Sequence, residues 1–457
     1  MIFERVRSEG LAHISYFIAS KSEACVIDPR RDIGKYIELA YEADATIKYI
    51  FETHRNEDYV IGSLELAQDG HAEIFHGPNL DFAYGNTLQT GQDFQIGSLK
   101  IEWLYTPGHT DESVSYVLYD LGSGDEPIMV FTGDALFIGD VGRTDMYGRE
   151  EDRRMAENLY ESLFEKILPL GDQVIVCPAH GFGSVCGGKI SDREQSSIGI
   201  EKKQNPALQL TDKEEFIQYK INEHHFMAPY FNMMEKYNKE GPPLLKTRPK
   251  PKPMSPKEFQ AEMDKGAFCV DTRDPADFGG AHITSSYNII LDGLPLFSGW
   301  VLTYDKPILL IVKNYGDLEK AIRHLNRLGY DNIVGYLTGG IMGWYSHNFP
   351  TNSIPLLTAR ELKQKIDKNE DIFLLDVRSQ EEWESGHIES AHHIYIGKLK
   401  SNLEHIPKEK TIVTICGNGN RASLAASLLR KEKYTDVMNV LGSMKAWNSG
   451  GYPTVKN

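Results

Sequence analysis

The stretch THRNEDY (residues 53–59) follows the apolar run IKYIF and brings His54 to the end of a predicted strand. Three more apolar runs end in the same way, in Gly- or Pro-containing turns with a possible metal ligand: TPGHTDES (106–113), FTGDALF (131–137) and CPAHGFG (177–183). A single histidine at a strand end usually has only a structural role. Because all four turns carry imidazole or carboxylate, they together predict a metal site in a sheet-based domain. The candidate ligands are His54, His109, Asp134 and His180.

In this order and spacing the four turns resemble the motifs of the metallo-β-lactamase fold. GDVGRTD (139–145) narrows the resemblance to the branch of glyoxalase II and the persulfide dioxygenases. The resemblance covers roughly residues 1–235 and implies a four-layer αββα sandwich with the metal at one edge. Two-metal hydrolases of the family carry His-x-His-x-Asp-His in the first turn, where this chain has Asn56 and Tyr59 at the second and fourth ligand positions. An amide and a phenol replace imidazole poorly, so we expect a weakened dinuclear zinc site.

The ligands that remain, His54, His109 and Asp134, make up the two-histidine, one-carboxylate triad that binds non-haem Fe(II) and leaves open positions. Persulfide dioxygenases of this fold use such a site, so the resemblance implies one Fe(II) per chain, with zinc as the metal that could replace it. The residues expected near the metal, as orienting groups or pocket walls, are Asp58, Tyr59, Arg143 and His180. Arg143 pairs either with a substrate carboxylate or with an acidic neighbour. Cys186 lies either near the iron pocket or in a Gly-rich loop without a role.

The C-terminal half contains an internal repeat. FCVDTRDPADFGGAHI (268–283) matches LLDVRSQEEWESGHI (374–388), and GGIMGWYSHNFPT (339–351) matches GSMKAWNSGGYPT (442–454), at an offset of 103 to 105 residues. Each copy alternates apolar strands with amphipathic helices, which predicts two α/β domains, each with a parallel sheet covered by helices. The preceding stretch GPPLLKTRPKPKPMSPK is rich in Pro and Lys and is predicted to be an interdomain linker. The expected division is a domain at 1–240, the linker at 241–257, and domains at 258–352 and 353–457.

The last repeat carries a candidate nucleophile in the stretch TICGNGNRAS (414–423). An apolar strand ends at Cys416, a short loop follows, and Arg421 opens a helix; the loop residues are Gly417, Asn418, Gly419 and Asn420. Backbone N–H groups of such a loop point inward at a helix N-terminus. With Arg421 they are expected to lower the pKa of the Cys416 thiol and to stabilise a thiolate or persulfide anion. The stretch resembles a rhodanese active-site loop, and the Cys-to-Arg spacing of five positions suits a sulfurtransferase.

The middle repeat keeps this framework without the chemistry. In IVKNYGDLEKA (311–321), Val312 stands where Cys416 is in the last repeat, and Asp317 stands where Arg421 is. A valine side chain cannot carry sulfane sulfur, and an aspartate would repel an anion. This repeat is therefore predicted to be an inactive rhodanese that spaces the other domains or supports assembly.

Composition limits the partners. The 457-residue chain has a formal net charge of −16, which argues against nucleic acid and anionic membranes as partners. It has five scattered cysteines, no apolar run long enough for a membrane span and no secretory signal at the N-terminus. These features favour a cytoplasmic location. The family resemblance suggests a homo-oligomer.

The resemblance as a whole is to fusions of a persulfide dioxygenase with a sulfurtransferase. It implies oxidation of a low-molecular-weight persulfide by dioxygen to sulfite, followed by transfer of sulfane sulfur from Cys416 to sulfite. The product would be thiosulfate, and the effect would be detoxification of sulfide. The sequence leaves open which thiol carries the persulfide. Two alternatives remain: a zinc-dependent thioester hydrolase like glyoxalase II, against which Asn56 and Tyr59 count, and a persulfide carrier that uses Cys416 alone, against which the intact triad counts.

Overall fold

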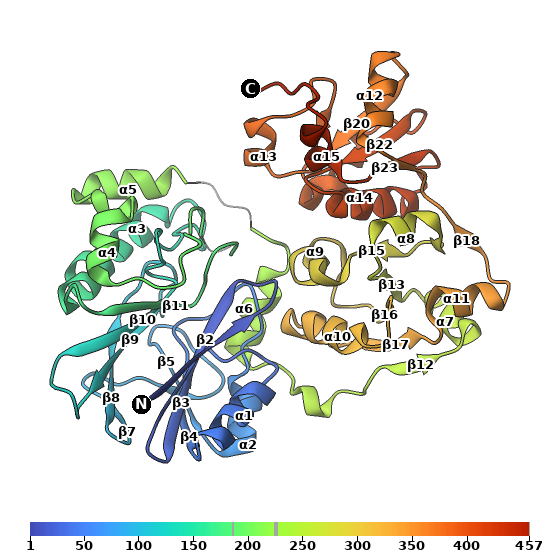
Figure 1. The fold of residues 1–457 in the computed structure, drawn as a ribbon. Helices are drawn as coiled ribbons and strands as arrows, with labels where there is room; N and C mark the ends of the chain where they lie inside the picture. The colour runs from blue at the N-terminus through green and yellow to red at the C-terminus, as the bar shows by residue number, and fades with distance from the viewer. Residues whose placement is uncertain (185–186, 224–226, 457) are drawn as a thin grey trace. The chain divides into compact units, whose positions relative to one another are not determined.

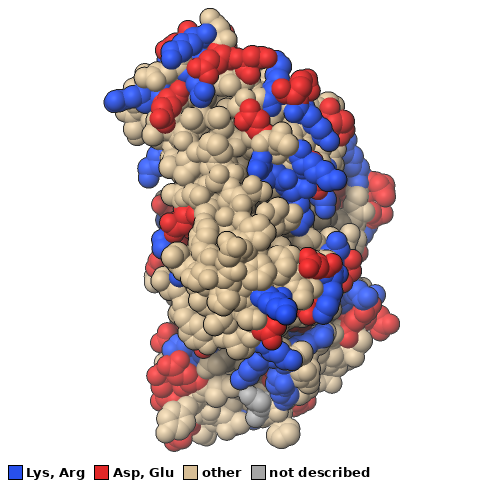
Figure 2. Space-filling view, turned by 90° about the vertical axis from the view of Figure 1, so that its right-hand side faces the viewer, with Lys and Arg blue, Asp and Glu red and all other residues tan. Residues whose placement is uncertain are grey.

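The computed structural model describes residues 1–184, 187–223 and 227–456, and Cys186 lies outside these described residues. The chain divides into two compact units: Met1–Thr247 with Asn326–Gly329, and Arg248–Leu325 with Tyr330–Asn457. No helix among the described residues is both long and apolar enough to cross a membrane. On the face drawn in Figure 2, acidic and basic side chains are interspersed, in keeping with 49 Lys and Arg and 65 Asp and Glu residues in the chain.

The first unit is built on two sheets (Figure 1). One has the order β1-β2-β3-β4-β5-β6, and the other has the order β11-β10-β9-β8-β7. The strands of the first sheet are β1 (Ile2–Ser8), β2 (His13–Ser20), β3 (Glu23–Ile27), β4 (Thr46–Phe51), β5 (Glu73–His76) and β6 (Asn86–Thr87). The strands of the second are β7 (Phe94–Ile96), β8 (Leu99–Tyr105), β9 (Val114–Asp120), β10 (Pro127–Gly133) and β11 (Ile175–Pro178). One buried cluster joins the sheets, since Phe51 and Phe75 pack with Tyr116 and Phe131.

Helices cover the outer faces of both sheets. Tyr36 of α1 (Gly34–Glu42) and Leu66 of α2 (Ser63–Gly70) belong to the core of the first sheet. Leu159 of α3 (Asp152–Glu161) and Phe216 of α5 (Lys213–Ile221) belong to the core of the second sheet. The described residues of this unit also form the α-helices α4 (Ile198–Gln204) and α6 (Phe231–Glu240). The predicted αββα sandwich is therefore confirmed.

The second unit contains two copies of one topology. The middle repeat has the strand order β12-β17-β16-β13-β15, and the last repeat has the corresponding order β19-β23-β22-β20-β21, with parallel pairing in both. The strands are β12 (Lys252–Met254), β13 (Phe268–Asp271), β15 (Tyr287–Asn288), β16 (Ile308–Ile311), β17 (Ile333–Leu337), β19 (Leu356–Leu357), β20 (Ile372–Asp376), β21 (His392–His393), β22 (Thr411–Ile415) and β23 (Val437–Val440). A separate antiparallel pair is formed by β14 (His282–Ile283) and β18 (Thr351–Asn352). The two predicted α/β domains are confirmed.

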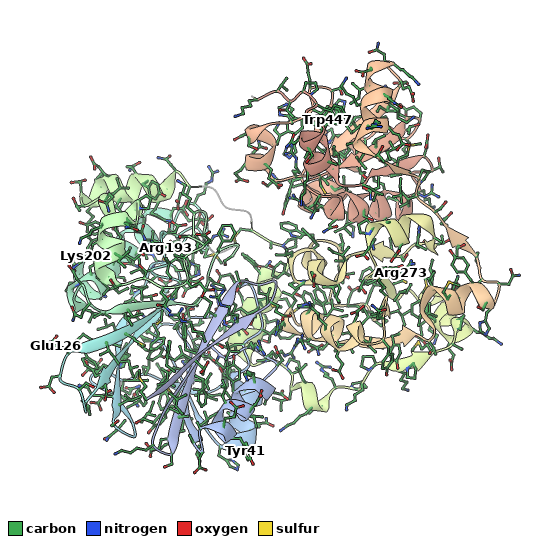
Figure 3. All side chains as sticks on the ribbon, in the orientation of Figure 1. Tyr41, Glu126, Arg193, Lys202, Arg273 and Trp447 are labelled. Atoms are coloured by element: carbon green, nitrogen blue, oxygen red, sulfur yellow. The ribbon has the colours of Figure 1, made fainter. Side chains whose placement is uncertain are left out.

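The helices and their anchoring contacts also repeat. The middle repeat has α7 (Pro256–Asp264), α8 (Pro275–Gly280), α9 (Leu294–Val301), α10 (Asp317–Arg327) and α11 (Gly340–Ser346), and the last has α12 (Ala359–Asp367), α13 (Gln380–Ser385), α14 (Asn420–Lys431) and α15 (Ser443–Ser449). Each repeat buries a tryptophan, Trp344 or Trp447, whose indole N–H donates to a proline carbonyl six residues later. Arg273 pairs with Asp271 in the middle repeat just as Arg378 pairs with Asp376 in the last. Figure 3 labels Arg273 and Trp447.

The stretch predicted as a linker differs from the expectation at its C-terminal end. Residues Lys252–Met254 form β12 and pair with β17, and Ser255 starts α7 with a capping box to Glu258. Proline has no N–H to donate, so it is tolerated at the edge of a sheet, where β12 lies. The Pro-rich stretch therefore contains an edge strand that composition alone does not indicate. The sheet of the middle repeat begins before residue 258.

Asn288 of the middle repeat ties two parts of the second unit together. Its amide nitrogen donates to the carbonyl oxygens of Asp271 at 3.1 Å and Arg273 at 2.8 Å. Its Oδ1 accepts from Ser423 Oγ at 2.5 Å, and its backbone N–H donates to Ser427 Oγ at 3.1 Å. Both serines lie on α14, the helix that follows the cysteine loop. The middle repeat therefore supports this helix through a buried polar network.

We expect Asn288→Ala to lower the free energy of unfolding of the second unit by about 2–3 kcal/mol, because it leaves buried carbonyl and hydroxyl groups without partners. Denaturant unfolding followed by tryptophan fluorescence checks this, since four of the five tryptophans lie in this unit. Asn332→Ala, at an exposed asparagine of the same repeat, is the control and should change stability by less than about 0.5 kcal/mol. Equal stability of the two variants would show that the network is not stabilising.

Candidate metal centre and cysteine loop

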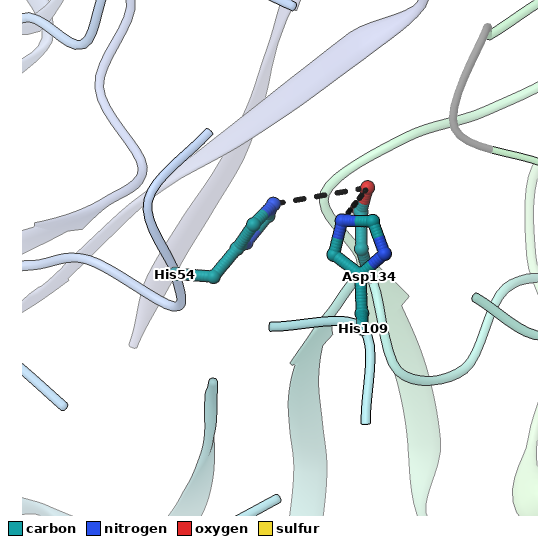
Figure 4. Close-up of side chains that lie close together, drawn as sticks. All are labelled: His54, His109 and Asp134. Carbon is teal, nitrogen blue, oxygen red and sulfur yellow. Dashed lines mark ion pairs between the residues drawn. The ribbon is translucent and has the colours of Figure 1, made fainter. Parts of the chain in front are cut away.

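Three strand ends bring the predicted ligands together. His54 follows β4, His109 follows β8 and Asp134 follows β10, and all three side chains are buried. Their ligand atoms lie within 4.8 Å of one another. Asp134 Oδ2 is 3.8 Å from His54 Nε2 and 3.7 Å from His109 Nε2 (Figure 4). Bonds of about 2.1 Å to one ion place neighbouring donors about 3–4 Å apart, so this spacing fits a mononuclear metal site.

The donor atoms also fit a cation by their surroundings. His54 Nε2 and Asp134 Oδ2 are buried and have no hydrogen-bond partner in the described part of the chain. A buried polar atom without a partner costs free energy, and a cation between these two atoms would remove that cost.

Hydrogen bonds behind the histidines turn both Nε2 atoms toward this site. Thr53 Oγ1 donates to Asp28 Oδ2 at 2.7 Å, and the backbone N–H of Thr53 donates to Asp28 Oδ1 at 2.8 Å. The same hydroxyl oxygen lies 2.9 Å from His54 Nδ1 and accepts the hydrogen of that ring nitrogen. His109 Nδ1 donates to the carbonyl oxygen of Arg143 at 3.0 Å. With hydrogen on Nδ1, each ring keeps an Nε2 lone pair for a metal.

We expect Thr53→Val to lower the Fe(II) affinity about 10- to 100-fold, because the valine keeps the shape but removes the link from His54 to Asp28. Competition against a colorimetric chelator under anaerobic conditions measures this affinity. Thr53→Ser retains the hydroxyl and should bind iron like the unmodified chain. If the valine variant also binds iron with unchanged affinity, the hydroxyl does not orient His54.

His180 lies between two carboxylates. Its Nδ1 is 2.7 Å from Asp134 Oδ1, and its Nε2 is 3.0 Å from Asp58 Oδ2. Burial opposes a charge on the ring, but the attraction of Asp134 and Asp58 outweighs it and raises the pKa of His180 well above its ordinary value. Asp58 and His180 thus form a pair next to the triad, where the sequence places them.

Tyr59 and Arg143 also lie near the triad. The ring of Tyr59 is buried and packs on His13 with centroids 3.9 Å apart, so it forms a wall beside His180. The guanidinium of Arg143 pairs with the carboxylate of Asp145 at 2.6 and 3.0 Å. Of the two partners expected for Arg143, a substrate carboxylate or an acidic neighbour, the structure has the acidic neighbour. Its carbonyl oxygen holds His109, as described above.

Glu57 was not predicted, and it reaches the triad directly. Its Oε1 lies 2.9 Å from His109 Nε2, and its Oε2 lies 3.9 Å from His54 Nε2. Burial opposes charge on both partners, but their attraction raises the pKa of His109 to about 9 and holds the pKa of Glu57 below its usual range. The family motif compares only four positions of this turn, and Glu57 falls between them.

The cysteine loop has the expected position at the end of β22. Cys416 is buried, and the backbone N–H of Gly419 donates to its Sγ at 3.1 Å. Gly419 has φ +108°, a conformation that favours glycine and that turns this N–H inward. The backbone N–H of Cys416 donates to Ser443 Oγ at 3.1 Å. Asn420 is the first residue of α14, and its N–H donates to Asn418 Oδ1.

Arg421 has a partner that sequence analysis missed. Its two terminal nitrogens donate to the carboxylate of Glu382 at 2.5 and 2.6 Å. Glu382 also accepts the backbone N–H of Ser379 and completes the capping box of α13. The positive charge of Arg421, which we expected to act on Cys416, is therefore partly balanced by the carboxylate of Glu382.

The corresponding place in the middle repeat is a cavity of about 480 Å³. Val312 lies in its wall where the last repeat has Cys416, and Lys313 pairs with Asp277 at 3.1 Å. Asp277 corresponds to Glu382, so both repeats keep an acid with a basic partner at this point. Only the last repeat has a nucleophile in the loop.

Comparison with known proteins agrees with this architecture. Residues 9–180 match the metallo-β-lactamase superfamily, and residues 255–347 and 358–450 each match the rhodanese-like domain. The chain is similar to the persulfide dioxygenase ETHE1 of Bos taurus, with 31% identity over 202 residues, 43% of this chain and 70% of that protein. The chain belongs to the metallo-β-lactamase superfamily and carries tandem rhodanese-like domains. The resemblance predicted from the sequence is thereby confirmed.

Two further proteins are similar to this chain. Hydroxyacylglutathione hydrolase GloC of Haemophilus influenzae is 28% identical over 210 residues, 41% of this chain and 88% of that protein. A crystal structure of a metallo-β-lactamase from Staphylococcus aureus is 31% identical, with a TM-score of 0.66 over 74% of this chain and 98% of that chain. The superfamily therefore includes similar proteins named for a dioxygenase and for a hydrolase. Sequence similarity alone does not distinguish these two kinds of enzyme.

Proposed function

We propose that the first unit is a persulfide dioxygenase with one non-haem Fe(II) per chain. The compact group of two histidines and one aspartate carries this proposal, because it is the donor set of mononuclear iron oxygenases. The similarity to persulfide dioxygenase ETHE1 supports it. The overall change is R–S–SH + O₂ + H₂O to R–SH + SO₃²⁻ + 2 H⁺, in which the outer sulfur is oxidised and dioxygen is reduced.

The residues of the chain have separate tasks in this reaction. His54, His109 and Asp134 would hold the ion, which supplies redox chemistry and a Lewis-acid position when bound. Thr53 and the carbonyl oxygen of Arg143 fix the ring orientation of the two histidines. Tyr59 and the buried walls around it exclude water from the sulfur.

We further propose that the last domain transfers sulfane sulfur through Cys416. A thiolate at Cys416 attacks the outer sulfur of a persulfide, forms a new S–S bond and releases the thiolate of the carrier. Sulfite then attacks the outer sulfur: Cys–S–S⁻ + SO₃²⁻ gives Cys–S⁻ + S₂O₃²⁻. The N–H of Gly419, 3.1 Å from Sγ, supports this role, because a backbone donor at this place would stabilise a thiolate or persulfide anion. The dioxygenase would supply the sulfite acceptor.

The second candidate is a zinc-dependent thioester hydrolase, which the similarity to GloC favours. Asn56 and Tyr59 count against it, because a dinuclear site lacks two imidazole ligands there. The third possibility, a persulfide carrier without metal chemistry, is disfavoured by the compact triad.

The deciding experiment is metal content by mass spectrometry on anaerobically purified protein, with oxygen uptake on addition of glutathione persulfide to the same sample. About one iron per chain together with oxygen uptake and sulfite formation supports the dioxygenase. Protein that holds only zinc and consumes no oxygen after iron reconstitution would overturn it, and hydrolysis of a glutathione thioester would then favour the hydrolase. Protein without metal that still takes up sulfane sulfur would favour the carrier.

The cytoplasmic location and the homo-oligomer stay predictions.

A further inference from the structure

Trp300 belongs to the middle repeat, but its side chain contacts the last repeat within the second unit. It lies on α9, and its indole ring packs edge-on against the ring of Tyr395, with centroids 5.5 Å apart and ring planes at 85°. Tyr395 stands directly before the 3₁₀ segment Ile396–Ser401 of the last repeat. The repeat without a nucleophile therefore supplies an aromatic side chain to the repeat that has one.

The backbone of the last repeat is fitted to this indole at Gly397. A Cβ atom on Gly397 would lie 2.5 Å from Trp300 Cε3 and 2.7 Å from Tyr395 Cε1, closer than side-chain carbons approach other atoms. The φ of Gly397 lies outside the left-handed region, so the backbone conformation does not require glycine here. The corresponding residue of the middle repeat, 105 positions earlier, is Asp292. Glycine at position 397 thus makes room for the indole.

Tyr395 lies at the same edge of the sheet as Cys416. The backbone N–H of Ile396 donates to the carbonyl oxygen of Val377 at 3.2 Å. The N–H of Val377 in turn donates to the carbonyl oxygen of Ile415 at 3.0 Å, and Ile415 is the residue before Cys416. These two hydrogen bonds place Tyr395 beside the strand end that carries the cysteine loop.

The hydroxyl of Tyr395 is also within the influence of the ion pair at this loop. Burial raises the pKa of Tyr395, the positive charge of Arg421 opposes this rise, and the carboxylate of Glu382 adds to it. Arg421 reaches the cysteine loop, since its Nη2 lies 3.1 Å from the position of a Cβ atom on Gly417. Arg421 therefore lies between the aromatic pair and the residue that follows Cys416.

We propose that Trp300 is a positioning residue of the sulfurtransferase site, which holds the ring of Tyr395 beside Arg421 and Glu382. A fixed aromatic ring next to this ion pair excludes water and keeps the guanidinium close to the sulfur of Cys416. A charge held in place in this way stabilises an anionic sulfur better than a mobile, hydrated one. The middle repeat thereby takes part in sulfur transfer without a nucleophile of its own. This inference rests on the proposed role of Cys416.

The test is Trp300→Ala in the 457-residue chain. The kcat/KM of thiosulfate formation from glutathione persulfide and sulfite should fall about 10- to 100-fold, the effect of a small displacement at a reacting group. A second readout compares the rates at which anionic iodoacetate and neutral iodoacetamide alkylate Cys416, followed by peptide mass spectrometry. Both reagents react with the thiolate, so displacement of Arg421 should lower the ratio of the two rates about 5-fold. Trp300→Phe keeps an aromatic ring and should recover most of both values.

Leu296→Ala is the matched control, because Leu296 lies on the same helix and is 42% exposed, and it should leave both values unchanged. Normal values in Trp300→Ala, or an equal loss in Leu296→Ala, would overturn the proposal. If Trp300→Ala does not fold, Gly397→Ala replaces it, because its added methyl group displaces the indole and should lower both values; normal values there would likewise contradict the proposal. If the unmodified chain forms no thiosulfate, the proposed transfer fails, and the alkylation ratio still decides whether Trp300 positions Arg421.

Discussion

Replacing His109 with alanine is expected to remove bound iron and to lower persulfide-dependent oxygen uptake at least about 1,000-fold. The imidazole contributes one of three clustered donors, and its loss leaves His54 and Asp134 as the remaining members of the triad. A metal supplies several kcal/mol of transition-state stabilisation, and each 1.4 kcal/mol is about a factor of ten in rate. Iron content by mass spectrometry and oxygen uptake with glutathione persulfide measure the two effects on the same sample.

Two comparisons make the His109→Ala result specific. His71→Ala, at an exposed histidine of the same unit, should retain iron and oxygen uptake. His109→Ala itself should still accept sulfane sulfur at Cys416, because that site lies in the other unit. If His109→Ala keeps about one iron per chain and normal oxygen uptake, the triad is not the metal site.

The sequence predicts a site well where a motif places the ligand at the end of a strand. His54, His109 and Asp134 each follow an apolar run, and the structure brings their ligand atoms within 4.8 Å. Asp28 follows β3 in the stretch ACVIDP and shows the same pattern, so it could have been found. Its role could not, because the link to His54 passes through the hydroxyl of Thr53, and a threonine in a turn carries no signal of its own.

Other features depend on contacts between distant segments. Glu57 meets His109 across 52 residues of sequence, and Glu382 meets Arg421 across 39 residues. Neither hydrophobic periodicity nor a sequence motif predicts such pairs, since acidic residues in turns and helices are common at the surface. The edge strand β12 was missed for a different reason: proline suits both a linker and an unpaired strand edge, and composition cannot separate the two.

Replacing Cys416 with serine is expected to abolish sulfane-sulfur transfer, with a loss of at least about 1,000-fold, because a hydroxyl cannot form the persulfide on which the transfer depends. Oxygen uptake should continue, since the triad lies in the other unit. The product of persulfide oxidation should then shift from thiosulfate to sulfite. Ion chromatography of the products and intact mass after treatment with persulfide measure both effects, the unmodified chain gaining one sulfur atom.

Cys269→Ala is the matched control for this change. Cys269 lies in β13 of the middle repeat and is buried like Cys416, but it precedes Asp271 on a strand and is not part of a loop. Burial raises the pKa of its thiol, so it remains a protonated and weak nucleophile. This variant should keep both the added sulfur and thiosulfate formation. If Cys416→Ser still forms thiosulfate at the normal rate while Cys269→Ala does not, the middle repeat is the sulfurtransferase and the last repeat is its support.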